Sequence, residues 1–385
     1  MINAEAFIEA ARGHGFTRYT GVPCSYLTPF INYVINDDLL SYISSANEGD
    51  AVATAAGLTL GGESAVVMMQ NSGLGNAVNP LTSLAHTFAI PLLLIVTHRG
   101  KPGRGDEPQH ELMGKITSDL FDLMEIPWEP FPAEEPDIGP LLERVSRYCT
   151  ERQKPYALLM DQDVVAPHPL QCESIPFRAN VRCRRRSFAG NPPKPPTREQ
   201  ALREITGHTP VDDSILIGTT GYTGRELFAI GDRDNQIYMV GSMGCASAFA
   251  LGASLARPEL EVTVVDGDGA GLMRMGNFAT IGSYGQNNLT HILLDNGVHE
   301  STGSQATVSA NVSFADIAAA CGYGTALYGN DLAVLRELFA RKDADGARFA
   351  QLKIEPGTPS DLPRPTTSPG NVLRRLTAHI NAQSG

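Results

Sequence analysis

The fold is decided by the stretch Glu261-Val262-Thr263-Val264-Val265-Asp266-Gly267-Asp268-Gly269. Residues 261–265 are mostly β-branched, which predicts a buried strand. The glycines on either side of Asp268 predict a tight turn into a helix that begins near Ala270. Another strand is predicted over residues 290–294. A strand followed by a glycine turn, a helix and a further strand is typical of a parallel α/β sheet.

Asp268 and Asn296 each follow one of these two predicted strands. Because neighbouring parallel strands end at the same edge of a sheet, the two side chains are expected to lie close together. A carboxylate and an amide oxygen are ligands that Mg²⁺ prefers, with phosphates, a backbone carbonyl and water supplying the rest. The glycines would let the backbone approach a diphosphate. The alternative is an ordinary turn with an unrelated asparagine downstream.

Strand and helix signals alternate along both halves of the chain, which predicts an α/β protein with two doubly wound parallel-sheet domains. Residues 166–200 lose this periodicity and are rich in proline, which predicts a linker and no central third domain. The predicted bounds are 1–165, 166–200 for the linker, and 201–385. Strands are predicted over 17–23, 40–44, 64–70, 91–97, 156–160, 214–217, 236–240, 261–265 and 290–294, and helices over 26–34, 48–60, 74–85, 225–229, 245–256 and 371–380.

The composition is that of a globular protein, with 42% hydrophobic and 19% charged residues. The net charge of −12 disfavours a general nucleic-acid binder. The basic run 182–186 is expected to be an exposed part of the linker. Residues 1–12 do not predict a signal peptide, and the longest apolar run, 91–96, is too short to cross a bilayer. Six cysteines without a CxxC pair argue against a zinc site or a disulfide framework and predict a cytoplasmic location.

The segments Gly267-Asp268-Gly269 and Asn296-Gly297-Val298 together resemble the signature of the thiamine diphosphate enzymes. The resemblance implies that Mg²⁺ is bound by Asp268, Asn296 and the carbonyl of Val298. Asp295 stands where many members carry a first asparagine, which is not the usual ligand. The resemblance further implies that Gly267, Gly269, Ala270, Ser301 and, in the loop Gly218-Thr219-Thr220-Gly221, Thr219 contact the cofactor.

The first half carries a segment, Ala46-Asn47-Glu48-Gly49-Asp50-Ala51, that resembles the glutamate motif of the same family. The resemblance implies that Glu48 protonates a ring nitrogen of the cofactor's aminopyrimidine. A carboxylic acid in an apolar pocket can share such a proton. The alternative is a carboxylate stabilised at a helix N-terminus. The loop Asn71-Ser72-Gly73-Leu74-Gly75-Asn76 follows in the expected order and would bring Gly73 to the cofactor.

The segment Gly241-Ser242-Met243-Gly244 resembles the part of the family that bends the cofactor. The resemblance implies that the Gly241 carbonyl accepts a hydrogen bond from the cofactor's amine. It also implies that Met243 is the bulky side chain beneath the two rings. Met243 could equally fill space in the core.

The order of the two modules, with no central domain, resembles the small decarboxylases of phosphonopyruvate and sulfopyruvate. The resemblance implies decarboxylation of 3-phosphonopyruvate to phosphonoacetaldehyde in phosphonate and antibiotic biosynthesis, with sulfopyruvate as the alternative substrate. It also implies a homodimer or higher homo-oligomer with active sites at the subunit interface. The stretches that carry it are Gly21-Val22-Pro23-Cys24-Ser25, Asp106-Glu107-Pro108-Gln109-His110 and Asp295-Asn296-Gly297-Val298-His299-Glu300-Ser301-Thr302-Gly303.

Three polar residues are candidates for contact with the substrate itself. The resemblance implies that Ser25 orients the substrate carboxylate, although Ser25 could instead cap the helix predicted over 26–34. His110 and His299 are both candidates for the proton donor, and either could be an ordinary histidine.

A phosphonate needs positively charged donors. Arg99, Lys101 and Arg104 form the natural cluster, unless they are only a solvated basic loop; Arg364 is a weaker candidate.

Two other classes of function remain open from the sequence. A cofactor-binding but inactive regulatory subunit is disfavoured because Glu48, Asp268 and Asn296 are all present. A nicotinamide-dependent enzyme is disfavoured because no GxGxxG motif follows the first predicted strand.

Overall fold

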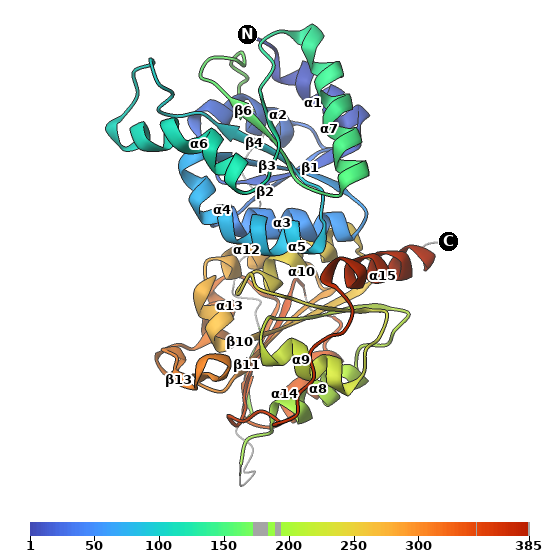
Figure 1. The fold of residues 1–385 in the computed structure, drawn as a ribbon. Helices are drawn as coiled ribbons and strands as arrows, with labels where there is room; N and C mark the ends of the chain where they lie inside the picture. The colour runs from blue at the N-terminus through green and yellow to red at the C-terminus, as the bar shows by residue number, and fades with distance from the viewer. Residues whose placement is uncertain (172–183, 189–193, 344, 384–385) are drawn as a thin grey trace. The chain divides into compact units, whose positions relative to one another are not determined.

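The computed structural model describes residues 1–171, 184–188, 194–343 and 345–383. The chain divides into two compact units, Met1–Ile175 and Pro176–Gly385, and each is built on its own sheet (Figure 1). Within the described residues, no helix is long and apolar enough to cross a membrane. Four cysteines in these ranges form no disulfide with one another: Cys24, Cys149, Cys245 and Cys321.

The first unit contains a six-stranded sheet in the order β2-β1-β3-β4-β6-β5, in which every pair of neighbours is parallel. The strands are β1 Phe16–Gly21, β2 Ser41–Ser44, β3 Ser64–Gln70, β4 Leu93–Thr97, β5 Trp128–Pro130 and β6 Tyr156–Met160. The main helices are α1 Ala4–Gly13, α2 Thr28–Asn36, α3 Glu48–Leu60, α4 Leu74–Pro80, α5 His86–Phe88, α6 Glu111–Leu123 and α7 Ile138–Arg152.

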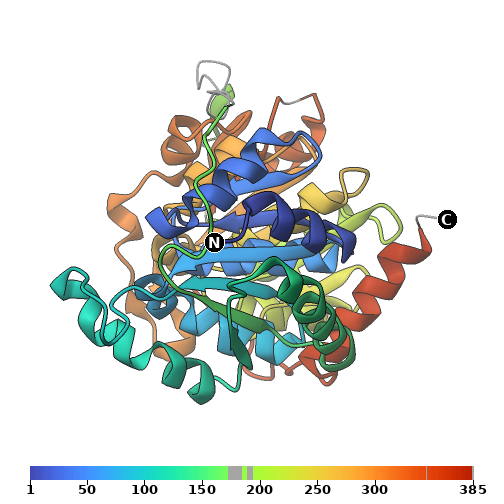
Figure 2. The same ribbon diagram turned by 90° about the horizontal axis from the view of Figure 1, so that it is seen from above.

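Both faces of this sheet are buried, as expected for parallel strands connected by helices. Val66 and Met68 of β3 belong to one core with residues of α1, α2 and α7. The alternate residues, Val67 and Met69, are also fully buried, and α3 packs on that side against β1 and β3. Figure 1 shows α1, α2 and α7 on one side of the strands and α3 to α5 on the other, and Figure 2 looks down on the α1 and α7 side.

The second unit contains a seven-stranded parallel sheet in the order β7-β14-β15-β11-β10-β8-β9 and a small antiparallel pair, β12 and β13. The strands are β7 Arg184–Phe188, β8 Ser214–Gly218, β9 Gln236–Tyr238, β10 Glu261–Gly267, β11 Leu289–Asp295, β12 Val298–His299, β13 Gln305–Ala306, β14 Thr325–Gly329 and β15 Arg348–Lys353. The helices are α8 Arg198–Gly207, α9 Tyr222–Ile230, α10 Ala246–Ala256, α11 Asp268–Met273, α12 Asn277–Tyr284, α13 Phe314–Ala320, α14 Ala333–Ala340 and α15 Pro369–Ala382.

The predicted neighbourhood of the opening stretch is confirmed. Strands β10 and β11 pair in parallel, with Gly267 opposite Leu294. The helix after the glycine turn begins at Asp268, two residues earlier than predicted. Asp268 and the segment that contains Asn296 therefore leave the same edge of the sheet.

The prediction that residues 166–200 form only a linker is wrong. Arg184–Phe188, which includes most of the basic run, is the edge strand β7 and pairs in parallel with β14. Helix α8 begins at Arg198 and is capped by Thr197. The rest of the basic run, Arg182 and Cys183, lies outside the described residues, as do Cys172, Pro192 and Pro193.

Candidate functional site

A cavity of about 160 Å³ opens in the second unit where β8, β10 and β11 end. Ligands bind at this edge in open α/β sheets, because the loops after the strands converge there. The helices α9 and α11 both begin beside it. The cavity is lined by ten of the predicted site residues: Thr219, Met243, Gly267, Asp268, Gly269, Ala270, Asn296, Val298, His299 and Ser301.

The two predicted metal ligands are held by short local contacts. The Asp268 side chain is buried, and the Thr307 hydroxyl donates a hydrogen bond to its Oδ2. Asn296 Oδ1 accepts a hydrogen bond from the Val298 backbone N–H at 3.1 Å. This turn needs Gly297, whose φ is +74°. Each ligand oxygen is thus positioned by the chain around it.

The donor set fits a cation that shares its shell with phosphate oxygens. Among the described residues, no cluster of three or more His, Cys, Asp or Glu side chains could hold a metal ion alone. Asp268, Asn296 and a backbone carbonyl are all hard oxygen donors, and Mg²⁺ commonly takes few protein ligands when a phosphate supplies the others. The residues present therefore fit Mg²⁺ bound together with a diphosphate.

Gly269 has no room for a side chain. A Cβ at Gly269 would lie 2.6 Å from His299 Cε1 and 2.8 Å from the Met243 methyl carbon. The bare backbone therefore lets both side chains close over the start of α11. This contact brings together three residues that the sequence placed in separate motifs.

Gly241 is the predicted cofactor residue of this unit that does not line the cavity. It is exposed, and its N–H donates a hydrogen bond to Thr220 Oγ1 at 3.1 Å. The turn that follows is strained, since Ser242 has a φ of +44°. Gly241 is therefore tied to the loop at residues 218–221 through Thr220.

A buried arginine in the cavity wall was not predicted. The guanidinium of Arg198 is ion-paired with Glu226 at 2.5 Å and with Glu300, and all three side chains are almost fully buried. Burial raises the pKa of Glu226 above its ordinary value. Glu300 also accepts hydrogen bonds from the Gly357 N–H and the Thr358 hydroxyl. The group fastens the Val298–Ser301 side of the cavity to α8 and α9.

The sequence contains a signal for this arginine. Thr197 and Gln200 form a capping box, a pattern that marks the start of a helix. Recognising it would have placed Arg198 in the first turn of α8 rather than in a linker. Its partners Glu226 and Glu300 are distant in sequence and carry no such signal.

In the first unit, Glu48 is the first residue of α3, after the capping residue Asn47. Its Oε2 accepts a hydrogen bond from Asn76 Nδ2 at 2.8 Å. Gly73 packs directly against the same carboxylate. Glu48 and the loop around Gly73, which the sequence analysis treated as separate segments, are therefore in contact. Glu48 also has the position of a carboxylate at a helix N-terminus, so the two interpretations are compatible.

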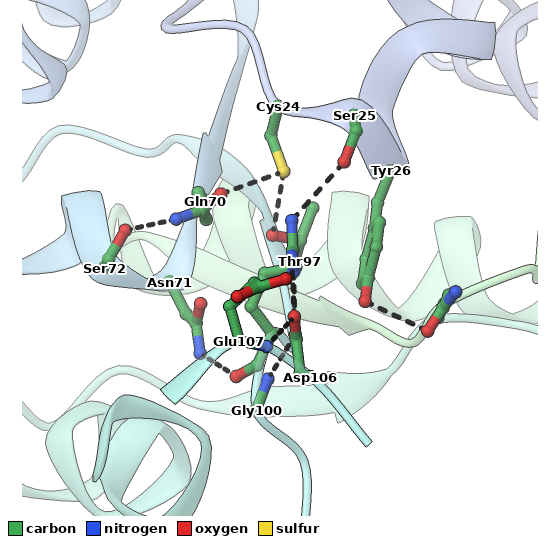
Figure 3. Close-up of polar contacts among 12 residues, drawn as sticks. Cys24, Ser25, Tyr26, Gln70, Asn71, Ser72, Thr97, Gly100, Asp106 and Glu107 are labelled. Atoms are coloured by element: carbon green, nitrogen blue, oxygen red, sulfur yellow. Dashed lines mark hydrogen bonds and ion pairs between the residues drawn. The ribbon is translucent and has the colours of Figure 1, made fainter. Parts of the chain in front are cut away.

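Ser25 lies where β1, β3 and β4 end. The Sγ atom of its neighbour Cys24 lies 3.4 Å from Gln70 Oε1 and 3.5 Å from Thr97 Oγ1 (Figure 3). Ser25 begins a short 3-10 turn and α2 starts at Thr28, so the alternative that Ser25 caps that helix is wrong. The Ser25 hydroxyl instead accepts a hydrogen bond from Arg99 at 3.4 Å and lines a cavity of about 430 Å³.

Arg99 is already paired with a carboxylate. It donates two hydrogen bonds to Asp106, at 2.8 and 2.5 Å, and these hold the pKa of Asp106 well below its ordinary value. The backbone N–H groups of Gly100 and Glu107 donate to the same carboxylate, each at 2.8 Å (Figure 3). The guanidinium also lies over the ring of Tyr26 at 4.8 Å. Arg99 therefore serves to fold the loop between β4 and α6.

The other two predicted cations differ from each other. Lys101 is ion-paired with Asp161. The Arg104 guanidinium donates a long hydrogen bond, 3.4 Å, to the Gln162 carbonyl, and it makes no ion pair within the described part of the chain. Arg104 is thus the cation of the three that is left to meet an anion.

His110 is buried at the start of α6, beside Gly100. Its Nδ1 is buried and has no hydrogen-bond partner among the described residues. A buried ring nitrogen without a partner is unusual, because buried polar atoms are nearly always satisfied. The position is consistent with a histidine that meets a ligand.

Comparison with known proteins identifies the family of domains to which each unit belongs. Residues 1–123 match the N-terminal TPP binding domain of thiamine pyrophosphate enzymes, and residues 217–344 match the C-terminal TPP binding domain. The structure superposes on the thiamine diphosphate-dependent 4-hydroxybenzoylformate decarboxylase of Rhodococcus jostii with a TM-score of 0.69 and 14% identity, over 92% of this chain and 99% of that one. This likeness concerns the fold alone.

Two curated relatives span nearly the whole chain. It is 43% identical over 381 residues to the phosphonopyruvate decarboxylase of Streptomyces viridochromogenes, which covers 99% of this chain and 95% of that protein. It is 30% identical over 387 residues to the sulfopyruvate decarboxylase of Methanosarcina acetivorans, which covers 98% of each.

The fold and the matched domains define a thiamine diphosphate-binding enzyme. The predicted architecture is confirmed: there are two such domains, and the described residues between them form no third domain. More particularly, the chain belongs to the phosphonopyruvate decarboxylase family of thiamine diphosphate-dependent decarboxylases, and it is a carboxy-lyase.

Proposed function

We propose that this enzyme decarboxylates 3-phosphonopyruvate to phosphonoacetaldehyde and CO2, using thiamine diphosphate and Mg²⁺. The observation that carries the proposal is the cavity of the second unit, where Asp268, Asn296 and the bare backbone of Gly269 converge. Similarity to phosphonopyruvate decarboxylases over nearly the whole chain supports the choice of substrate.

When bound, thiamine diphosphate supplies an electron sink for the electron pair that remains as CO2 leaves. Asp268, Asn296 and the carbonyl of Val298 would hold Mg²⁺, which in turn binds the diphosphate. Arg198 and Glu300 would keep the wall of this cavity in place. The residues proposed to contact the cofactor are Glu48, Gly73, Thr219, Gly241, Met243, Gly267, Gly269, Ala270 and Ser301.

Glu48 is proposed to exchange a proton with a nitrogen of the aminopyrimidine ring. The hydrogen bond from Asn76 occupies Oε2, so Oε1 is the oxygen that would hold the proton. Gly73 packs against this oxygen, with no room for a side chain between them. The hydrogen bond from Asn76 thus fixes the orientation of the Glu48 carboxyl group.

The substrate carries a carboxylate and a phosphonate. Ser25 would orient the carboxylate through a neutral hydroxyl, which does not stabilise the charge that has to be lost. Arg104 is the proposed partner of the phosphonate, assisted by Arg99 and Lys101 at the same loop. One proton must replace CO2 on the product carbon, and His110 and His299 are both candidates to deliver it.

We also propose that the enzyme is a homodimer or a higher homo-oligomer, with active sites at the subunit interface, because members of this family complete each site from two subunits. We further propose a cytoplasmic location, in keeping with six cysteines that form no CxxC pair, and a place in phosphonate and antibiotic biosynthesis, which the similarity to phosphonopyruvate decarboxylases supports. Size-exclusion chromatography with light scattering tests the assembly, and a monomer that retains full activity would contradict it.

The decisive test is a decarboxylation assay coupled to aldehyde detection. We expect turnover of phosphonopyruvate that requires both thiamine diphosphate and Mg²⁺, and that is lost after treatment with a chelator. The second candidate substrate is sulfopyruvate, favoured by the full-length similarity to a sulfopyruvate decarboxylase. A larger kcat/KM for sulfopyruvate than for phosphonopyruvate would overturn the substrate assignment.

Replacing the glutamate separates an active enzyme from an inactive regulatory subunit. Glu48→Gln should abolish turnover and leave thiamine diphosphate binding largely intact, since the amide keeps the shape but cannot exchange the proton. Glu134→Gln, at an exposed position of the same unit, is the control and should behave as the unmodified enzyme. Unchanged activity in Glu48→Gln would contradict the proposed role of Glu48 in proton exchange.

A further inference from the structure

The residue before the proposed metal ligand Asn296 is a fully buried aspartate. Asp295 ends β11, and its carboxylate is 0% exposed. The chain therefore has a buried negative charge next to the proposed cation site. A buried carboxylate is costly unless it is paired and hydrogen-bonded.

The neighbouring strand supplies the compensating charge. Lys353 of β15 stands directly opposite Asp295 in the register of the two parallel strands. Its ammonium lies 2.5 Å from Asp295 Oδ2, and Gln351, two residues earlier on the same face, donates to the same oxygen at 2.8 Å. The Lys353 side chain is 32% exposed, whereas the Asp295 side chain is not exposed at all. Together the aspartate and lysine are neutral, as an asparagine would be.

A row of hydroxyls links this pair to the other proposed ligand, Asp268. Ser309 Oγ donates to Asp295 Oδ1 at 3.0 Å, and Thr307 Oγ1 donates to Asp268 Oδ2. The two hydroxyl oxygens lie 3.0 Å apart. Because each hydroxyl has one proton, each can serve one carboxylate, and the contact between them fixes their spacing. Both ends of the metal site are therefore attached to one network.

We propose that Lys353 is the counter-charge that permits aspartate at position 295. We further propose that the Asp295–Lys353 pair, through Ser309 and Thr307, positions Asn296 and Asp268 to bind Mg²⁺. This inference rests on the proposed Mg²⁺ site. Lys353 is a positioning residue: it acts through Asp295 and does not itself contact the metal. Such outer-shell partners typically change metal affinity about 10- to 100-fold when they are removed.

The test compares three variants of the full-length enzyme: Lys353→Met, Asp295→Asn and the double variant. Thiamine diphosphate binding is measured by calorimetry across a Mg²⁺ titration, together with the unfolding midpoint of the cofactor-free protein and the kcat at saturating Mg²⁺. Lys342→Met serves as the control, because it removes a lysine that is 75% exposed and whose ion pair with Glu261 is long, at 4.0 Å.

We expect Lys353→Met to need about 10-fold more Mg²⁺ while keeping most of its kcat at saturation. Its unfolding midpoint should also fall, because Asp295 is left uncompensated. In the double variant the pair is neutral again, so its Mg²⁺ requirement should return to within about threefold of that of the unmodified enzyme. If Lys353→Met does not fold, a double variant that folds and binds Mg²⁺ normally supports the inference, and one that does not fold overturns it.

Two results would count against the inference, and they are distinguishable. Folded Lys353→Met with an unchanged Mg²⁺ requirement, or a double variant no better than the single one, overturns the role of Lys353 alone. Binding of thiamine diphosphate to the unmodified enzyme without any need for Mg²⁺ overturns the proposed metal site, and the inference with it.

Discussion

The carboxylate of Glu48 lies directly against Gly73: a Cβ at Gly73 would come within 2.2 Å of Glu48 Oε1. One residue begins α3 and the other lies in the turn before α4. Glycine is required here because any side chain would displace the carboxylate. The two family-like segments of the first half are thus parts of one contact.

Gly73→Ala should push the Glu48 carboxylate aside. The fold should stay intact, because the carboxylate is at the end of a flexible side chain. Displacing a catalytic group by about 1 Å can cost about 100-fold in rate, so we expect a fall of that order in kcat. Gly75→Ala is the matched control, because nothing lies within 4 Å of a Cβ at that position. Equal activity of the two variants would contradict the proposed role of the contact.

Arg104→Ala should weaken substrate binding with little effect on stability, because Arg104 has no carboxylate partner within the described residues. A charged hydrogen bond contributes about 1.5–3 kcal/mol, so KM should rise about 10- to 100-fold. Steady-state kinetics with phosphonopyruvate checks this, with exposed Arg147→Ala as the control. An unchanged KM would remove Arg104 from the list of anion ligands.

Asp106→Asn should destabilise the first unit by about 1–3 kcal/mol, since it leaves Arg99 and two backbone donors poorly paired. The pKa of Asp106 is held below its ordinary value, so the carboxylate contributes stability above the ordinary range of aspartate, near pH 4. That contribution disappears only as the pH falls through the lowered pKa. Denaturant unfolding should therefore give Asp106→Asn a free energy of unfolding that is lower than that of the unmodified enzyme by the same amount from pH 8 to pH 5. A difference that changes across this range would contradict the ion pair.

Arg198→Met should cost about 3–5 kcal/mol, because it leaves Glu226 and Glu300 buried without their cation. Thiamine diphosphate affinity should fall as well, since Glu300 lies in the cavity wall. Arg203→Met, on the same helix but with a side chain that is 60% exposed, is the matched control. Similar unfolding curves for the two variants would show that the buried group does not hold the cavity.

Local patterns predicted the elements that surround the site. Strand β3 and helix α3 have the predicted bounds, and β10 and β11 are neighbours as expected. Buried parallel strands are continuous apolar runs, and glycine turns mark where they end, so these signals are strong. The segments that contain Asp268, Asn296 and Glu48 all lie on such elements or directly after them.

The sequence did not predict the elements that lie away from the site or depend on distant partners. Helices α1, α6 and α7 bury only one face, so their apolar residues are interrupted by charged ones. Strand β7 has no apolar pattern and exists because β14 pairs with it. The pairing of Arg99 with Asp106 was likewise hidden, because a cation in a glycine-rich loop gives no sign of its partner.

The attachment of β7 to β14 decides where the polypeptide could be divided in two. Without β7, the β14 edge would be left with unpaired backbone groups, which invite aggregation. Residues 172–385 made alone should therefore stay more soluble than residues 194–385, as sedimentation after expression would measure. If the two units were encoded by separate genes, we therefore expect the division to lie before β7, so that this strand stays with the second unit.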